Sequence, residues 1–125
     1  MNRPPQYDLR FEFVQEIRFG PPLFRLHGVG FAIESRGSEI LVSEALARLP
    51  DGRGFVVEQF LATRSDQPVA TRLIMVAAPS GTVSELLPRV RGRRTPTGVT
   101  PQGHLVYRER LVDSSSETSR TLQLG

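Results

Sequence analysis

The side chains most able to do chemistry in this chain of 125 residues are arginines that gather in one stretch. All sixteen basic residues are arginine, and five of them fall between positions 86 and 108, where there is no acidic residue. This stretch therefore holds more than the whole net charge of +3. Planar guanidinium groups pair bidentately with carboxylates and phosphates. We predict that the partner-binding residues are Arg89, Arg91, Arg93, Arg94 and Arg108.

The kind of partner follows from what accompanies these arginines. Proteins that bind single-stranded nucleic acid add aromatic side chains on which bases stack. Only Tyr107 lies near the basic stretch in the sequence. An acidic protein surface is therefore the favoured partner. Nucleic-acid binding through a loop from Arg89 to Arg94 is the alternative, and a solvated loop with no partner is the plainest reading.

Residues that could catalyse a reaction or hold a metal are scarce. The chain has no cysteine, which excludes thiolate metal sites and cysteine nucleophiles. Its two histidines, His27 and His104, each lie beside an expected turn, and a structural role suits them better than a metal site or acid-base chemistry. Ser38 and Ser80 lie beside glycines but in no Gly-x-Ser-x-Gly sequence. We expect no enzyme activity, metal or cofactor.

The framework that must position the arginines is predicted to be all-β, with little helix. Residues 9–19 alternate with period two, which is typical of a strand with one face on a core and the other in water. The proline pair after Gly20 ends this strand. The expected buried set is Leu9, Phe11, Phe13, Ile17 and Phe19, and the expected exposed set is Arg10, Glu12, Glu16 and Arg18.

The remaining elements are predicted from apolar runs and turn residues. Residues 39–49 are ambiguous, and we favour a strand that ends near Ser43, with helical propensity after it. The turn at Asp51-Gly52 is expected to be of type I′. The other expected elements are short strands at 23–27 and 31–34, a hairpin of 55–63 with 69–77, a short strand or helical turn within 83–90, a surface loop at 91–103, and a strand at 105–111 with 120–124 paired back on it.

A phrase occurs twice in the chain, and it carries a resemblance to a known family. Pro50-Asp51-Gly52-Arg53 and Pro101-Gln102-Gly103-His104 lie 51 residues apart, and an apolar run follows each copy. Residues 49–87, LPDGRGFVVEQFL with TRLIMVAAPSGTVSELL, resemble a blade of the TolB-like β-propellers. The resemblance implies two to three incomplete blades arranged as antiparallel meanders. Because a closed propeller needs at least four blades, open sheet edges are expected.

A second resemblance concerns function. The opening Glu16-Ile17-Arg18-Phe19-Gly20-Pro21-Pro22, together with the single PDGR blade, looks like small bacterial proteins encoded beside polymorphic toxins. It implies an immunity protein that neutralises a cognate toxin by occlusion. The rival to a binding module is a structural subunit that assembles through its sheet edges. We expect one domain over residues 1–125, with neither a leader segment nor a membrane span and therefore in the cytoplasm.

Overall fold

The computed structural model describes residues 7–16, 21–34, 40–61, 69–114 and 116–124. These residues contain strands and no helix, so the all-β prediction is confirmed. The strands are β1 (Asp8–Glu16), β2 (Pro22–Val29), β3 (Leu41–Arg48), β4 (Gly54–Phe60), β5 (Ala70–Ala77), β6 (Val83–Glu85), β7 (Val90–Val99), β8 (His104–Leu111) and β9 (Thr118–Gln123).

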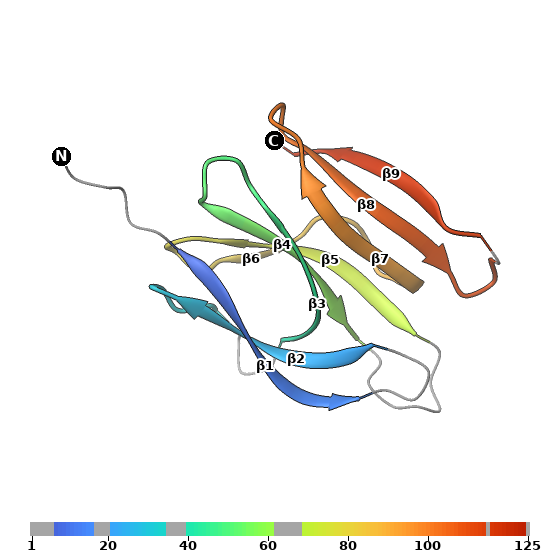
Figure 1. Cartoon of the computed structure of the whole chain (residues 1–125), viewed down its shortest axis with the longest axis horizontal. Helices are drawn as coiled ribbons and strands as arrows, with labels where there is room; N and C mark the ends of the chain where they lie inside the picture. Colours follow the sequence, from blue (N-terminus) through green and yellow to red (C-terminus); the bar gives the residue numbers. More distant parts are fainter. Residues whose placement is uncertain (1–6, 17–20, 35–39, 62–68, 115, 125) are drawn as a thin grey trace.

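The strands form one open antiparallel sheet in which neighbours along the chain are neighbours in space. The order is β1-β2-β3-β4-β5-β7-β8-β9, with β6 paired to β5 beside β7. Figure 1 shows β7, β8 and β9 side by side as a layer distinct from the strands before them. Among the described residues, the strand pairing between this layer and β5 consists of two residue pairs, Ala70 with Arg91 and Thr71 with Val90. The fold is thus a meander whose last three strands form a second layer, packed against β3, β4 and β5.

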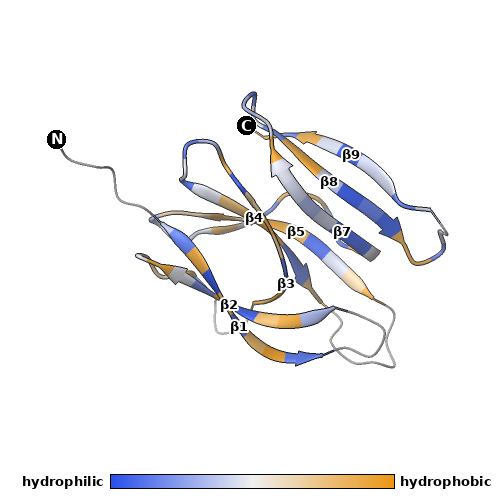
Figure 2. Ribbon diagram, viewed as in Figure 1, coloured by the Kyte–Doolittle hydropathy of each residue, from blue (hydrophilic) through white to orange (hydrophobic). Residues whose placement is uncertain are grey.

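The core lies on both faces of β4, which is why its sequence is a nearly continuous apolar run. Phe55 and Val57 belong to an apolar cluster shared with β1, β2, β3 and β5. Val56 points the other way, into a second cluster with Leu105 and Tyr107 of β8. Figure 2 shows the hydrophobic colouring along β4 and β5. Glu58 is a charged residue within this run, and its side chain is fully buried.

The predicted loop at 91–103 is wrong, because β7 occupies Val90–Val99. Glycine and proline in this segment mark bends in a strand. Gly92 has a φ of 139°, and the register with β8 shifts between Pro96 and Gly98 as in a β-bulge. Pro96 is tolerated because, among the described residues, pairing along the other edge of β7 ends at Arg91. Four of the five predicted arginines therefore lie on strands: Arg91, Arg93 and Arg94 on β7, and Arg108 on β8.

The alternation predicted for the first strand holds only in part. Leu9 is buried and Arg10 and Glu16 are exposed, as expected, whereas Phe11 and Glu12 are both half-buried. The prediction that Phe13 is buried is wrong, because 58% of its surface is exposed. Phe13 still pairs in regular register with Phe24 of β2, and the register shifts only after it, between Phe13 and Gln15, as in a β-bulge. The predictions for Ile17, Arg18 and Phe19 lie outside the described residues.

Several shorter predictions are confirmed and others corrected. The β4–β5 and β8–β9 hairpins and the strand at β6 are confirmed. β2 runs to Val29 without the predicted break, and residues 31–34 form no strand. β3 does not stop near Ser43 but continues to Arg48, because residues 46–48 pair with β4. Strand pairing here overrides the local helical propensity.

The repeated phrase forms the same tight turn twice. The amide of Gly52 donates to the Leu49 carbonyl at 3.0 Å, and the amide of Gly103 donates to the Thr100 carbonyl at 2.9 Å. Both glycines have positive φ, 74° and 86°, which favours glycine at these positions. The central residues are Pro50-Asp51 and Pro101-Gln102, so the predicted type I′ turn centred on Asp51-Gly52 is wrong. Proline fixes φ near −65°, which suits the second position of a type I turn.

Candidate functional site

Arg93 is held by a buried carboxylate far away in the sequence. Its Nε donates to Glu58 Oε2 at 3.2 Å, and its Nη2 donates to Glu58 Oε1 at 2.7 Å. The Ser43 hydroxyl also donates to Glu58 Oε1, at 2.9 Å. The same guanidinium lies 5.5 Å from the centre of the Phe60 ring. Arg93 therefore neutralises a buried charge instead of facing a partner.

Arg94 is likewise committed inside the molecule. Its Nε donates to Glu109 Oε2 at 2.8 Å, and its Nη1 donates to the Pro88 carbonyl at 2.9 Å. Arg120 of β9 donates through Nε to the other carboxylate oxygen of Glu109, at 2.9 Å. The Arg94 hydrogen bond is the main cause that lowers the pKa of Glu109 below its ordinary 4.5, although burial opposes it. This ion-pair cluster ties β7, β8 and β9 together.

The depressed pKa of Glu109 predicts a loss of stability in acid. A carboxyl with a lower pKa in the folded state stabilises the fold above its unfolded pKa, near 4.5, and this stabilisation disappears as the pH falls through the folded pKa. We expect the urea midpoint of the protein to fall between pH 6 and pH 3 by more than that of Glu109→Gln. Equal falls in the two proteins would contradict a stabilising role of the ionised carboxylate.

The other predicted arginines have no such partner. Arg91 in β7, Arg108 in β8 and Arg89 just before β7 are exposed, and no ion pair joins any of them to another described residue. Arg110 shares these properties, although it lies outside the basic stretch of residues 86–108 and was not among the predicted residues. Its signal is the alternation of Arg108 and Arg110 along β8, which directs both side chains to one side of the sheet.

Exposed apolar residues lie near these arginines at the open end of the β7–β8 hairpin, away from its turn. Val112 follows β8 with the same alternation, and its amide donates to the Arg91 carbonyl at 2.9 Å. Val112 is 51% exposed and its neighbour Leu111 is 40% exposed. Figure 2 shows hydrophilic stretches of β7 and β8 side by side. We call Arg91, Arg108, Arg110 and Val112 the arginine surface.

The one aromatic residue near this surface in sequence is turned away from solvent. Tyr107 is 5% exposed and packs in the cluster between β8 and the strands β3, β4 and β5. Its ring is therefore not available to stack on a base. The arginine surface combines unpaired cations with an aliphatic side chain.

The two histidines lie on different parts of the sheet. The His27 ring on β2 lies 2.8 Å from Glu12 Oε1 of β1, and this hydrogen bond, followed by one from Arg25, lowers the pKa of Glu12. His104 begins β8, and its amide donates to the Thr100 hydroxyl at 3.1 Å. Within the described ranges, no three residues among histidines, aspartates and glutamates come together as a metal site would require.

Two further findings concern the chain as a whole. In the part of the chain that the structure describes, no helix is long and apolar enough to cross a membrane. Comparisons with protein-family models, with curated proteins and with solved structures found no match. The resemblances to propeller blades and to toxin-associated proteins therefore stay predictions.

Proposed function

We propose that this chain is a protein-binding module that recognises an acidic partner through the arginine surface. The observation that carries the proposal is the division of the arginines: Arg93 and Arg94 are paired inside the molecule, whereas Arg91, Arg108 and Arg110 are exposed without an ion-pair partner among the described residues. Guanidinium groups left unpaired beside an aliphatic side chain form a surface suited to carboxylates rimmed by apolar contacts.

Each component of the surface has a separate physical role. The cations raise the rate of association with an acidic partner, and salt weakens that effect. Val112 loses apolar surface to the partner and so contributes affinity. A toxin is the first partner to test, because of the resemblance carried by residues 16–22 and the PDGR phrase. In that case the module neutralises the toxin by covering its active surface.

Two other functions remain alternatives. Nucleic-acid binding is the weaker of them, because Tyr107 is buried and the segment from Arg89 to Arg94 is mostly a strand whose Arg93 and Arg94 are already paired. A structural subunit would use the unpaired sides of β1 and β9, the two ends of the strand order. Both alternatives leave the arginine surface without a protein partner.

The proposal predicts that charge removal from the arginine surface weakens partner binding specifically. We expect Arg108→Gln/Arg110→Gln to bind the partner about tenfold more weakly at low salt, mainly through slower association. The matched control is Arg10→Gln/Arg53→Gln, which removes two other exposed arginines and gives the same net charge. The measurement is surface plasmon resonance with the product of a neighbouring toxin reading frame, or with an acidic protein captured on the wild-type chain.

Two results would contradict this function. One is equal weakening of binding by both double variants, which would mean that only the net charge matters. The other is binding of random-sequence DNA at micromolar or tighter affinity in physiological salt, with a salt slope that reports several released counterions. That result would favour the nucleic-acid alternative.

A further inference from the structure

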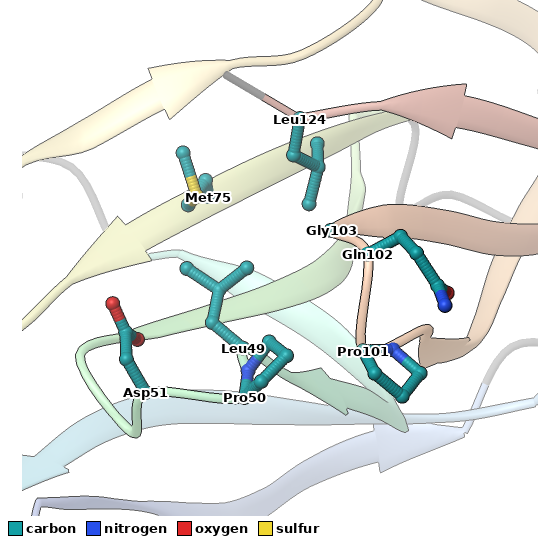
Figure 3. A pocket seen from close by; sticks show the side chains of 8 residues that line it. All are labelled: Leu49, Pro50, Asp51, Met75, Pro101, Gln102, Gly103 and Leu124. Carbon is teal, nitrogen blue, oxygen red and sulfur yellow. The ribbon is translucent and has the colours of Figure 1, made fainter.

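The two copies of the repeated phrase lie close together in the structure, and neither copy belongs to the arginine surface. Their turns line one pocket of about 390 Å³, and Met75 of β5 and Leu124 complete its lining. Figure 3 shows Leu49, Met75 and Leu124 directed toward a common space, with the two proline-containing turns below them. The pocket therefore joins segments that lie about fifty residues apart in the sequence.

The lining is mostly apolar, and its shape depends on a glycine. Leu49, Met75 and Leu124 are each only partly buried, so their side chains border open space. Gly54 begins β4, and a Cβ atom there would overlap the Leu49 side chain. Glycine at this position therefore leaves Leu49 free to line the pocket. A space of this size suits one large side chain and lies near the lower limit for small-molecule sites.

The pocket also carries one unbalanced charge. Asp51 is the one charged residue in the lining and is exposed. Its Oδ1 accepts the Arg53 amide at 2.9 Å, but the structure gives its carboxylate no ion pair with any described residue. Gln102, from the other turn, adds an amide that is able to hydrogen-bond a peptide. The site thus pairs an apolar space with a negative charge at its rim.

We propose that this pocket is a second binding site, which takes a large apolar side chain of a partner peptide that carries a cationic residue next to it. Leu49, Met75 and Leu124 contact the apolar side chain, and Asp51 pairs with the cation. The site does not depend on the function proposed above. It lies at the turn of the β7–β8 hairpin, whereas the arginine surface begins at Arg108, about 17 Å along the strand from Gly103.

The test uses three short peptides as probes: N-acetyl-Trp-Arg-amide, N-acetyl-Trp-Glu-amide and N-acetyl-Gly-Arg-amide. In NMR titrations of the full chain, we expect the Trp-Arg peptide to shift the Met75 methyl signal and the amide signals of Asp51, Gly103 and Leu124. Its affinity should exceed that of the Trp-Glu peptide by about threefold, the effect of one exposed ion pair. The Gly-Arg peptide should not bind measurably.

Two variants assign the binding to the pocket. Asp51→Asn keeps an oxygen for the Arg53 amide but removes the charge, so the preference for Trp-Arg over Trp-Glu should disappear. Leu124→Trp should fill the pocket and abolish binding, whereas Gln123→Trp adds the same side chain at an exposed neighbouring position and should not. The Arg108→Gln/Arg110→Gln variant should bind all probes as the wild type does, which separates this site from the function proposed above.

Four outcomes would overturn the proposal. They are the absence of shifts at the pocket with millimolar Trp-Arg peptide, equal affinity for the two tryptophan peptides, and unchanged binding in Leu124→Trp. The fourth is self-association of the chain that Asp51→Asn abolishes, measured by light scattering. That result would assign the pocket to the arginine surface of a second copy.

Discussion

Replacing Phe55 with alanine is expected to lower the free energy of unfolding by about 4 kcal/mol. The Phe55 side chain has no exposed surface and lies in β4, whose two faces both contact the core. Its ring stacks on Phe31 with 6.3 Å between the ring centres, and the Arg48 guanidinium lies 5.5 Å from the centre of the Phe55 ring. Truncation would leave a cavity in the apolar cluster that joins β1 to β5. The measurement is urea unfolding followed by circular dichroism.

The matched control is Phe13→Ala, the same substitution at a residue that is 58% exposed. Its ring contacts Phe24 edge to face, but little of its surface would be lost from a packed environment. We expect this variant to lose less than about 1 kcal/mol. Equal losses at Phe13 and Phe55 would contradict the arrangement of the core around β4.

Replacing Arg93 with methionine is expected to lower the free energy of unfolding by about 3 kcal/mol. The substitution removes both hydrogen bonds from the guanidinium to Glu58, whose side chain has no exposed surface. Among the described residues, the hydroxyl of Ser43 alone would then still donate to this carboxylate. Removal of one partner of a buried ion pair costs more than the pair itself contributes, because the other charge stays buried.

A matched variant and a double variant make this prediction specific. Arg91→Met changes an exposed arginine two residues away and should alter the stability by less than about 0.5 kcal/mol. Arg93→Met/Glu58→Leu removes both charges, and we expect it to recover most of the loss. A loss of less than 1 kcal/mol in Arg93→Met, or a double variant as unstable as the single one, would contradict the role of the pair.

The parts of the fold that the sequence predicts are those set by local pattern. The hairpin of β4 with β5 follows from two apolar runs about a short connection, and the β8–β9 hairpin follows from the alternation of Leu105 and Tyr107 with polar residues. The positive φ predicted for Gly52 from the Asp51-Gly52 dipeptide is confirmed, although the turn is centred one residue earlier, on Pro50-Asp51. In each case the residues that decide the structure are close in the sequence.

The parts that the sequence does not predict depend on contacts between distant residues. Pairing with β5 and β8 makes residues 90–99 a strand, although their two glycines and Pro96 favour a loop. Glu58 pairs with Arg93, 35 residues away, and no local pattern specifies that distance. One signal was present: an acid within the apolar run of β4 requires a buried partner. The exposure of Phe13 has no comparable signal in the sequence.

The wrong prediction of a loop at 91–103 also determined which arginines were predicted to bind a partner. A loop would have presented Arg91, Arg93 and Arg94 together to a partner. The strand instead gives Arg93 to Glu58 and Arg94 to Glu109, and it leaves Arg91 beside Val112 at the surface. Of the predicted cluster, Arg93 and Arg94 thus form ion pairs within the molecule, whereas Arg91 is exposed at the surface. Arg110 completes the free part from the neighbouring strand.

The most direct test of this division is the exchange rate of each arginine Nε hydrogen with water, measured by NMR. In the structure the Nε atoms of Arg93, Arg94 and Arg120 donate to buried or nearly buried carboxylates. We expect these three hydrogens to exchange much more slowly than those of Arg91, Arg108 and Arg110, which have no such acceptor among the described residues. Equally fast exchange at all six would contradict the division of the arginines between structure and binding.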